Sequence, residues 1–248
     1  MAQFLEVKNI HKNFGKLAAL SDISFSVQQG EVVGLIGPNG AGKTTLFNVI
    51  TGFYRASSGQ IFFKDQDVSQ AAPNKLAEMG LVRTFQIPRP FRELTVHDNV
   101  AVGTLFNPER MHKTQLSTTE FVEKVLDGVK LLPQKGNLAG NLGYGNLKKL
   151  EVGRAQGPLP DLLLLDEPFA GLTLSETESL IEILRGLATQ GLTLVIVEHK
   201  LKELMKLVKR VIVLHYGKKI ADGNPEEIAR NEQVLKAYLG RRWSKSNA

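Results

Sequence analysis

The sequence predicts an α/β fold built on a mixed, largely parallel sheet, with an antiparallel side sheet and a helical insertion. Three observations support this prediction. Segments near the N-terminus alternate apolar and polar residues, as half-buried antiparallel strands do. Later segments are short and apolar on every side, as expected of parallel strands covered on both faces. Amphipathic helices alternate with these later strands, and that order is typical of a parallel sheet.

The N-terminal elements follow from this alternation. Residues 4–10 and 23–30 predict the strands of the side sheet. Residues 31–37 form a more continuous apolar strand, which runs into a glycine-rich turn and then a helix over 43–52. Residues 57–68 predict a turn and a further strand.

The pattern becomes helical in the middle of the chain. Helices are predicted over 95–106 and 118–132, prolines punctuate the segment, and no strong strand pattern is present. The expected organisation is one domain over residues 1–240, with its core in 1–86 and 161–240, a helical subdomain in 87–160, and a basic tail in 241–248.

Strand patterns resume after residue 160. Buried strands are predicted over 161–167 and 192–199. The helix between them is predicted over 175–191, with Ser175 and Glu178 as a capping box. The last predicted elements are an amphipathic helix over 199–210 and a strand, tight turn and strand over 210–223.

Composition narrows the function classes. The chain has 248 residues, 42% hydrophobic and 23% charged, as in globular proteins. It has no cysteine, which excludes disulfides and cysteine-ligated metals. A net charge of +6 suits a polyphosphate, an anionic lipid or nucleic acid. No RNA-binding aromatic motif or zinc-finger spacing is present, so we expect no nucleic-acid partner. No apolar run is long enough to span a membrane and the N-terminus lacks a signal pattern, so we expect a cytosolic protein.

The strongest motif is GPNGAGKT at residues 37–44, between a predicted strand and a predicted helix. This spacing and context are typical of a phosphate-binding loop, whose backbone N–H groups surround phosphates. Lys43 is expected to reach the β- and γ-phosphates of ATP, and Thr44 to ligate Mg²⁺. The residues expected to bind ATP through this loop are Gly37, Pro38, Asn39, Gly40, Ala41, Gly42, Lys43, Thr44 and Thr45.

A second group of candidates lies at predicted strand ends. Asp166 and Glu167 end the buried strand LLLLDE, where ligands bind in parallel sheets. Asp166 can hold Mg²⁺ through water, and Glu167 can act as general base. His199 follows another apolar strand and can contact a γ-phosphate, although such a histidine is often structural. Gln86 can ligate Mg²⁺ or water through its carbonyl, although an ordinary loop glutamine is the simpler interpretation.

Taken in order, these residues resemble the ATP-binding subunit of an ABC transporter, and the resemblance covers nearly the whole chain. It implies a P-loop NTPase core, a Q-loop at Gln86, a Walker B segment at 162–167 and a catalytic switch role for His199. It also implies that Phe14 stacks on adenine; a core aromatic is the alternative. The signature turn, which meets the ATP of a second ATPase subunit, is expected at Leu142, Gly143, Tyr144, Gly145 and Asn146.

This signature turn departs from the family pattern L-S-G-G-Q, because Gly143 stands where the serine is usual. Tyr144 followed by glycine resembles importers of the branched-chain amino-acid type, especially their LivG-like subunits. Two further departures are Thr173 with Leu174, which replace an Asp or Asn and a Pro in the D-loop, and Lys200 after the switch histidine. We expect them to affect coupling between two ATP sites more than ATP binding.

The resemblance implies an ATP-hydrolysing subunit that powers an importer, for branched-chain or other amino acids. Its implied partners are a second ATPase subunit, identical or paralogous, transmembrane permease subunits and, indirectly, a substrate-binding protein. It would then lie on the cytoplasmic face of the inner or plasma membrane, and the loop IPRPFREL is the candidate permease contact. Alternative readings are the ATPase of a lipid or lipopolysaccharide exporter, a soluble ATPase acting on DNA or ribosomes, and a non-catalytic regulatory module.

Overall fold

A computed structural model describes residues 4–239 of the chain. The chain divides into two compact units, and each is described here by itself. Unit 1 contains residues 1–73 and 195–248, and unit 2 contains residues 74–194. The predicted basic tail at 241–248 lies outside the described residues.

Unit 1 contains the predicted antiparallel side sheet, with strand order β2-β1-β4-β5. The alternating pattern places Leu5, Val7 and Ile23 in the buried interior, as predicted. Opposite residues such as Leu5 and Val27 are paired in antiparallel register. The strands of this sheet are β1 (Leu5–Phe14), β2 (Leu17–Val27), β4 (Ser58–Phe63) and β5 (Gln66–Asp67).

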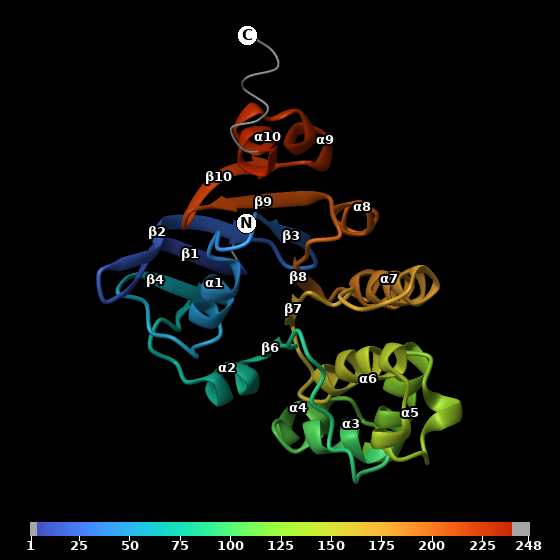
Figure 1. Ribbon diagram of the computed structural model, residues 1–248. Coiled ribbons are helices and arrows are strands. Elements are labelled where there is room, and N and C mark those ends of the chain that lie inside the picture. The colour runs from blue at the N-terminus through green and yellow to red at the C-terminus, as the bar shows by residue number, and fades with distance from the viewer. Residues whose placement is uncertain (1–3, 240–248) are drawn as a thin grey trace. The chain divides into compact units, whose positions relative to one another are not determined.

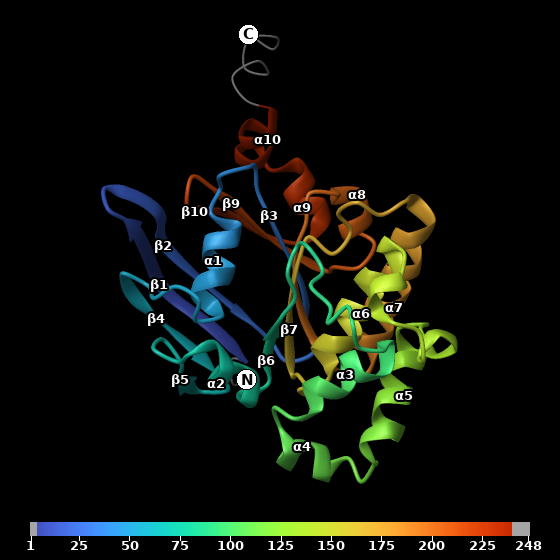
Figure 2. The ribbon, with the colours of Figure 1, turned by 60° about the horizontal axis from the view of Figure 1, so that its bottom comes forward.

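Unit 1 also contains mixed strand pairing. Strand β3 runs parallel to β9, and β9 pairs antiparallel with β10. Helix α1 directly follows β3 and lies beside the strands of this unit in both ribbon views (Figures 1 and 2). The elements are β3 (Val32–Ile36), α1 (Lys43–Ile50), α8 (Leu201–Leu204), β9 (Arg210–His215), β10 (Lys218–Gly223), α9 (Pro225–Arg230) and α10 (Glu232–Leu239).

Unit 2 contains the predicted helical segment and a parallel strand pair. Strand β6 runs parallel to β7, and all five residues of β7 are buried. Helices α3, α5 and α6 pack against one another, as Figures 1 and 2 both show. The elements are β6 (Leu81–Arg83), α3 (Val96–Thr104), α4 (Pro108–Lys113), α5 (Thr118–Gly128), η1 (Leu132–Gln134), η2 (Ala139–Asn141), α6 (Tyr144–Gln156), β7 (Leu162–Asp166) and α7 (Leu174–Thr189). Two elements span the unit boundaries, α2 (Pro73–Met79) and β8 (Thr193–Val197).

Two local predictions were wrong. The capping box of α7 is formed by Thr173 and Glu176, not by Ser175 and Glu178. Thr173 has extended backbone geometry and its hydroxyl accepts from the Glu176 amide, so the helix begins earlier than predicted. The predicted helix over 199–210 is α-helical only over Leu201–Leu204. Over residues 205–208 the backbone forms a mixture of i→i−3 and i→i−4 bonds, and the chain then enters β9 at Arg210.

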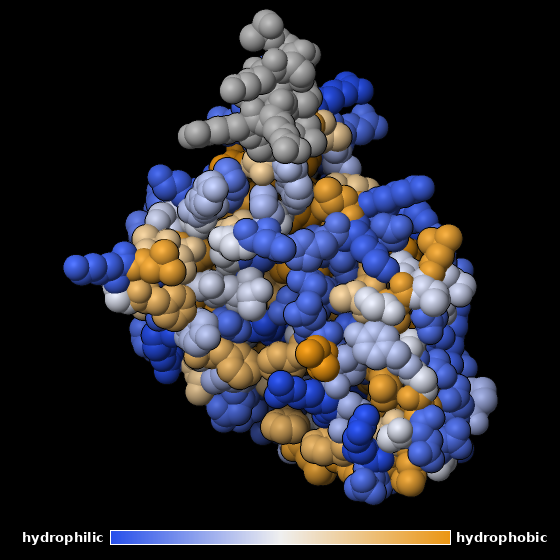
Figure 3. All heavy atoms as spheres, in the orientation of Figure 1, coloured by the Kyte–Doolittle hydropathy of each residue, from blue (hydrophilic) through white to orange (hydrophobic). Residues whose placement is uncertain are grey.

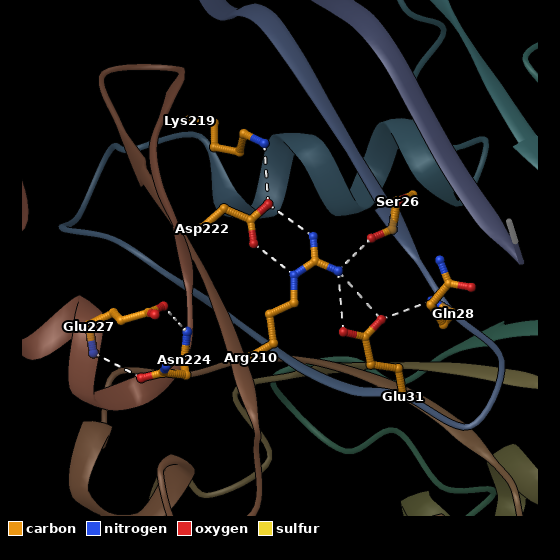
Figure 4. A network of polar contacts seen from close by, with 8 residues as sticks. All are labelled: Ser26, Gln28, Glu31, Arg210, Lys219, Asp222, Asn224 and Glu227. Carbon is orange, nitrogen blue, oxygen red and sulfur yellow. Dashed lines mark hydrogen bonds and ion pairs between the residues drawn. The ribbon is translucent and has the colours of Figure 1, made fainter. Parts of the chain in front are cut away.

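A polar network joins distant segments of unit 1 (Figure 4). The Arg210 guanidinium donates to both carboxylate oxygens of Asp222, at 2.7 and 2.9 Å. It also donates to the Ser26 carbonyl at 3.0 Å and to Glu31 at 3.2 Å. Lys219 donates to Asp222 at 3.2 Å. This network therefore ties the β9–β10 hairpin to the end of β2 and the start of β3.

This network predicts an acid-sensitive contribution to stability. Burial alone would raise the pKa of Asp222, but hydrogen bonds and charge from Arg210 and Lys219 lower it below its usual value. A carboxyl with a lowered folded-state pKa stabilises the fold above its unfolded pKa, near 4, and this stabilisation is lost as the pH falls through the folded pKa. Asp222→Asn should therefore lower the free energy of unfolding by about 1.5–3 kcal/mol at pH 7.

Urea denaturation of the wild type and of Asp222→Asn between pH 3 and 8 measures this effect. The difference in the free energy of unfolding between the two proteins should become smaller as the pH falls below about 4. The exposed Asp65→Asn is the matched control and should change little. A gap that is constant over the whole pH range would contradict the prediction.

Candidate nucleotide site

The phosphate loop is shaped by close backbone contacts within unit 1. A Cβ atom at Gly37 would lie 2.3 Å from the Leu214 carbonyl oxygen, so only glycine fits there. Gly42 has φ of 101° and precedes α1 as its N-cap. The Gly217 amide in the β9–β10 turn donates to the Ala41 carbonyl at 3.0 Å. These contacts hold the loop in a turn that ends at the N-terminus of α1, where the helix dipole favours anions.

Lys43 is the first residue of α1 and is 6% exposed. Its ammonium donates to the carbonyls of Gly37 and Pro38, at 2.7 and 3.1 Å. The amine therefore lies within the turn of its own loop. Thr44, the next residue, is exposed at the helix N-terminus. A phosphate bound at this turn would meet the ammonium and the first amides of the helix together.

Phe14 lies at the end of β1 and is 43% exposed, so it is not a core aromatic. Its ring meets Tyr54 edge to face, with centroids 5.4 Å apart. The Lys12 ammonium lies 4.9 Å from the Phe14 centroid and donates to the Arg55 carbonyl at 2.8 Å. Sequence reasoning missed Lys12 and Tyr54. A surface aromatic with these neighbours offers an apolar face suited to stacking on a planar base.

Tyr238 on α10 is a further contact of the phosphate loop that sequence reasoning missed. Burial raises the pKa of its hydroxyl to about 12, while a hydrogen bond from the Gly37 backbone acts in the opposite direction. Tyr238 lies in the segment KAYLG, which is one of the segments that resemble the family, and this resemblance could have pointed to it. The last helix of the described chain therefore contacts the first residue of the loop.

In unit 2, Asp166 ends strand β7 as predicted and is 5% exposed. Its Oδ2 forms an ion pair with Arg83 Nη2 at 2.6 Å, and both side chains are nearly buried. Arg83 ends the neighbouring strand β6, and its guanidinium also lies over the Phe85 ring. Sequence reasoning missed Arg83, because β6 is only three residues long, with one of them fully buried, and no apolar run marks it in the sequence.

Glu167 and Gln86 are brought together. Gln86 Nε2 donates to Glu167 Oε2 at 2.7 Å, so two residues proposed for the same site are in direct contact. Glu167 has φ of 48°, an uncommon backbone region for a residue with a side chain. Asp166 and Gln86 carry side-chain oxygens of the kind that Mg²⁺ prefers, and Asp166 Oδ2 is the oxygen paired with Arg83.

The signature turn begins helix α6. Gly143 is its N-cap, with φ of −64° and ψ of 158°, and no side chain caps the helix. The Tyr144 ring packs on Gly171, where a Cβ atom would lie 2.8 Å from the ring. A Cβ at Gly145 would lie 2.3 Å from Glu176 Oε1. Asn146 donates to Gln134 at 3.3 Å, and Leu142 is buried. The turn thus contacts the segment that contains the predicted D-loop.

The candidate residues fall into two sets, one in each unit. Unit 1 contains Phe14, the loop residues 37–45 and His199, which is exposed and whose amide donates to Glu198 at 2.9 Å. Unit 2 contains Gln86, the signature turn, Asp166 and Glu167. The unit 1 set has the chemistry to bind phosphate, and the unit 2 set contributes carboxylates.

Comparison with known proteins decides the family. The family model described as ABC transporter matches residues 20–170. The chain belongs to the ABC transporter family. A second model, described as branched-chain amino acid ATP-binding cassette transporter, matches residues 218–243. The ATP-binding protein LivG of Salmonella typhimurium, named for high-affinity branched-chain amino acid transport, is 37% identical, with 95% of this chain and 97% of LivG covered.

Solved structures of ABC proteins match the fold. The ADP conformation of MJ1267, an ATP-binding cassette of an ABC transporter, superposes with a TM-score of 0.86 at 33% identity, covering 97% of this chain and 100% of MJ1267. The cbiO1 protein of Clostridium perfringens, part of the ABC transporter complex cbiONQ, has a TM-score of 0.82 at 25% identity, covering 99% and 97%. The predicted fold and family are confirmed: this is an ABC ATPase with a P-loop NTPase fold. No helix within residues 4–239 is long and apolar enough to cross a membrane.

Proposed function

We propose that this ABC ATPase hydrolyses ATP to power an importer of branched-chain or other amino acids. The observation that carries the direction and substrate class is the match to LivG over nearly the full length of both chains. The C-terminal match at residues 218–243 supports the same subfamily. Neither alternative, an exporter of lipid or lipopolysaccharide or a soluble ABC ATPase, receives comparable support.

The proposed roles follow from the chemistry of each residue. Lys43 and the amides of residues 37–45 bind the phosphates, and Phe14 stacks on adenine. Glu167 accepts a proton from the attacking water, and Gln86 orients the Glu167 carboxylate through their hydrogen bond. His199 contacts the γ-phosphate. Thr44, Gln86 and Asp166 are the residues that would hold Mg²⁺, which would supply neutralising charge to the phosphates.

The proposed assembly is a head-to-tail pair of ATPase subunits bound to permease subunits at the cytoplasmic face of the membrane, with a substrate-binding protein acting indirectly. We propose the same division of domain 1–240 as the sequence suggests, with 87–160 as the helical subdomain. The loop at 87–94 is the proposed permease contact. Ile87 is 66% exposed, and Asn99 fixes the loop by accepting from the Phe91 amide at 2.9 Å.

Unit 2 has further exposed apolar side chains at the other end of α3. Leu105 and Phe106, directly after α3, are 76% and 52% exposed. Orange, apolar spheres are interspersed with blue, hydrophilic ones over the face seen in the space-filling view, including its lower part (Figure 3). Contiguous exposed apolar side chains, such as the neighbours Leu105 and Phe106, are typical of protein interaction surfaces.

Two assays test the proposal. Hydrolysis of Mg-ATP by the purified chain should rise more steeply than linearly with protein concentration, because two copies complete each site. Uptake of labelled leucine, isoleucine and valine by membrane vesicles that contain the permease should require ATP and this chain. Hydrolysis without any amino-acid uptake would leave the ATPase role intact and refute the import role.

The altered signature turn gives a separate prediction. A Cβ atom at Gly143 would meet nothing within 4 Å, and its backbone geometry suits serine at an N-cap. Gly143→Ser should therefore fold normally, and a hydroxyl that meets the γ-phosphate should raise kcat/KM by about tenfold, as one hydrogen bond to a charged group allows. Gly143→Ala is the matched control, because it adds the Cβ atom without the hydroxyl. Equal activity of the two variants would contradict the prediction.

A further inference from the structure

Lys148 is a buried lysine that the proposed mechanism does not use. It lies near the N-terminal end of α6 and is 2% exposed. Burial disfavours its charge, and a helix N-terminus is the unfavourable end for a cation. Specific contacts must therefore stabilise the ammonium at this position.

Those contacts are with the two proposed catalytic segments. Lys148 Nζ donates to the Gln86 carbonyl at 2.6 Å and to the Glu167 carbonyl at 3.2 Å. The side chains of Gln86 and Glu167 are joined to each other at 2.7 Å. The Lys148 ammonium thus binds the main-chain carbonyls of Gln86 and Glu167, the two residues whose side chains are hydrogen-bonded to each other. All three residues lie in unit 2.

The bond to the Glu167 carbonyl affects the backbone conformation that orients the Glu167 side chain. With φ of 48°, Glu167 occupies the left-handed region, which is unfavourable for a residue with a Cβ. This conformation sets the direction in which the side chain leaves the end of β7. The charge-assisted bond from Lys148 to this carbonyl offsets part of the unfavourable backbone energy and fixes the orientation of the Glu167 carboxylate.

A second residue of α6 holds the same loop. Glu151 Oε1 accepts from the Phe85 amide at 2.8 Å, one residue before Gln86. Two side chains of α6 therefore bind the backbone of residues 85–86: Glu151 binds the Phe85 amide and Lys148 binds the Gln86 carbonyl. They are three positions apart and lie on one face of the helix. The helix that begins with the signature turn is bonded to the Q-loop and to the end of β7.

We infer that Lys148 is a positioning residue for ATP hydrolysis, which holds Glu167 and Gln86 in their working arrangement on the signature helix. The inference rests on the proposed roles of Glu167 and Gln86. It assigns Lys148 no contact with nucleotide. Its loss should therefore affect the rate of the chemical step far more than nucleotide binding.

Steady-state kinetics of three variants test the inference. Lys148→Met should lower kcat by about 100-fold, within the range of a misplaced general base, and change KM for ATP by less than about threefold. Lys148→Arg, which retains donors and charge, should recover kcat to within about fivefold of wild type. Lys149→Met, the neighbouring lysine, is the matched control and should match wild type. A kcat for Lys148→Met within twofold of wild type would overturn the inference, as would no rescue by arginine.

Hydrogen–deuterium exchange separates this inference from the proposed function, because it needs no activity. Lys148→Met should speed exchange in peptides covering residues 84–88 and 166–171, and leave β1 and β2 unchanged. Unchanged exchange in those peptides would overturn the inference even if the wild type hydrolyses ATP. Should Lys148→Met not fold, Lys148→Gln is measured in the same way and judged by the same outcomes. A wild type that lacks hydrolysis but shows the exchange pattern would refute only the proposed function.

Discussion

Glu167→Gln is expected to lower the rate of ATP hydrolysis by about 100- to 10,000-fold, the contribution of a positioned general base. Glutamine has the same shape but cannot take a proton from water. The backbone bond from Lys148 and the left-handed geometry of residue 167 are unaffected, because neither uses the side chain. The loss should therefore come from chemistry and not from misfolding.

Nucleotide binding by Glu167→Gln should be retained, because Lys43 and the phosphate loop are unchanged. Isothermal titration with Mg-ATP and a steady-state hydrolysis assay measure the two quantities on one preparation. Glu109→Gln, an exposed glutamate on α4, is the matched control and should behave as wild type. Hydrolysis within tenfold of wild type would show that another group takes the proton.

Arg83→Met is expected to give the largest loss of stability. It would leave the Asp166 carboxylate, whose side chain is 7% exposed, without the guanidinium now 2.6 Å away. Removing one partner of a buried ion pair costs about 3–5 kcal/mol, because the remaining charge stays desolvated. Urea denaturation should show this loss, and the exposed Arg92→Met should show almost none.

The double variant Arg83→Met, Asp166→Leu distinguishes pairing from packing. Apolar replacement of both partners should recover most of the lost stability, since no charge remains buried. It should also abolish hydrolysis, because Asp166 is the proposed Mg²⁺ residue. A double variant as unstable as Arg83→Met alone would show that the arginine stabilises the fold by shape and not by charge.

The parts of the site that sequence could predict are local ones. The phosphate loop is one contiguous motif, and the strand before it and the helix after it lie where the sequence indicates. Asp166 and Glu167 were recognisable because they end an uninterrupted apolar strand. In each case neighbours along the chain carry the signal, so spacing alone suffices.

The partners of those residues were not predictable in the same way. Arg83 and Asp166 are 83 positions apart, and Lys148 and Gln86 are 62 apart. Such pairs depend on which strands become neighbours, which periodicity does not state. The capping box was misplaced for a related reason, because Thr173 and Ser175 each precede a glutamate at the right spacing and only the backbone distinguishes them.

The pairing of β3 with β9 has a consequence for how the protein is made. The strand that leads into the phosphate loop has its parallel partner at residues 210–215, and Arg210 joins Ser26 across 184 positions. Unit 2, one continuous segment, has left the ribosome before unit 1 can close. Nascent or truncated chains that stop before β9 should therefore be unable to bind ATP, and nucleotide affinity should be acquired only at the end of synthesis.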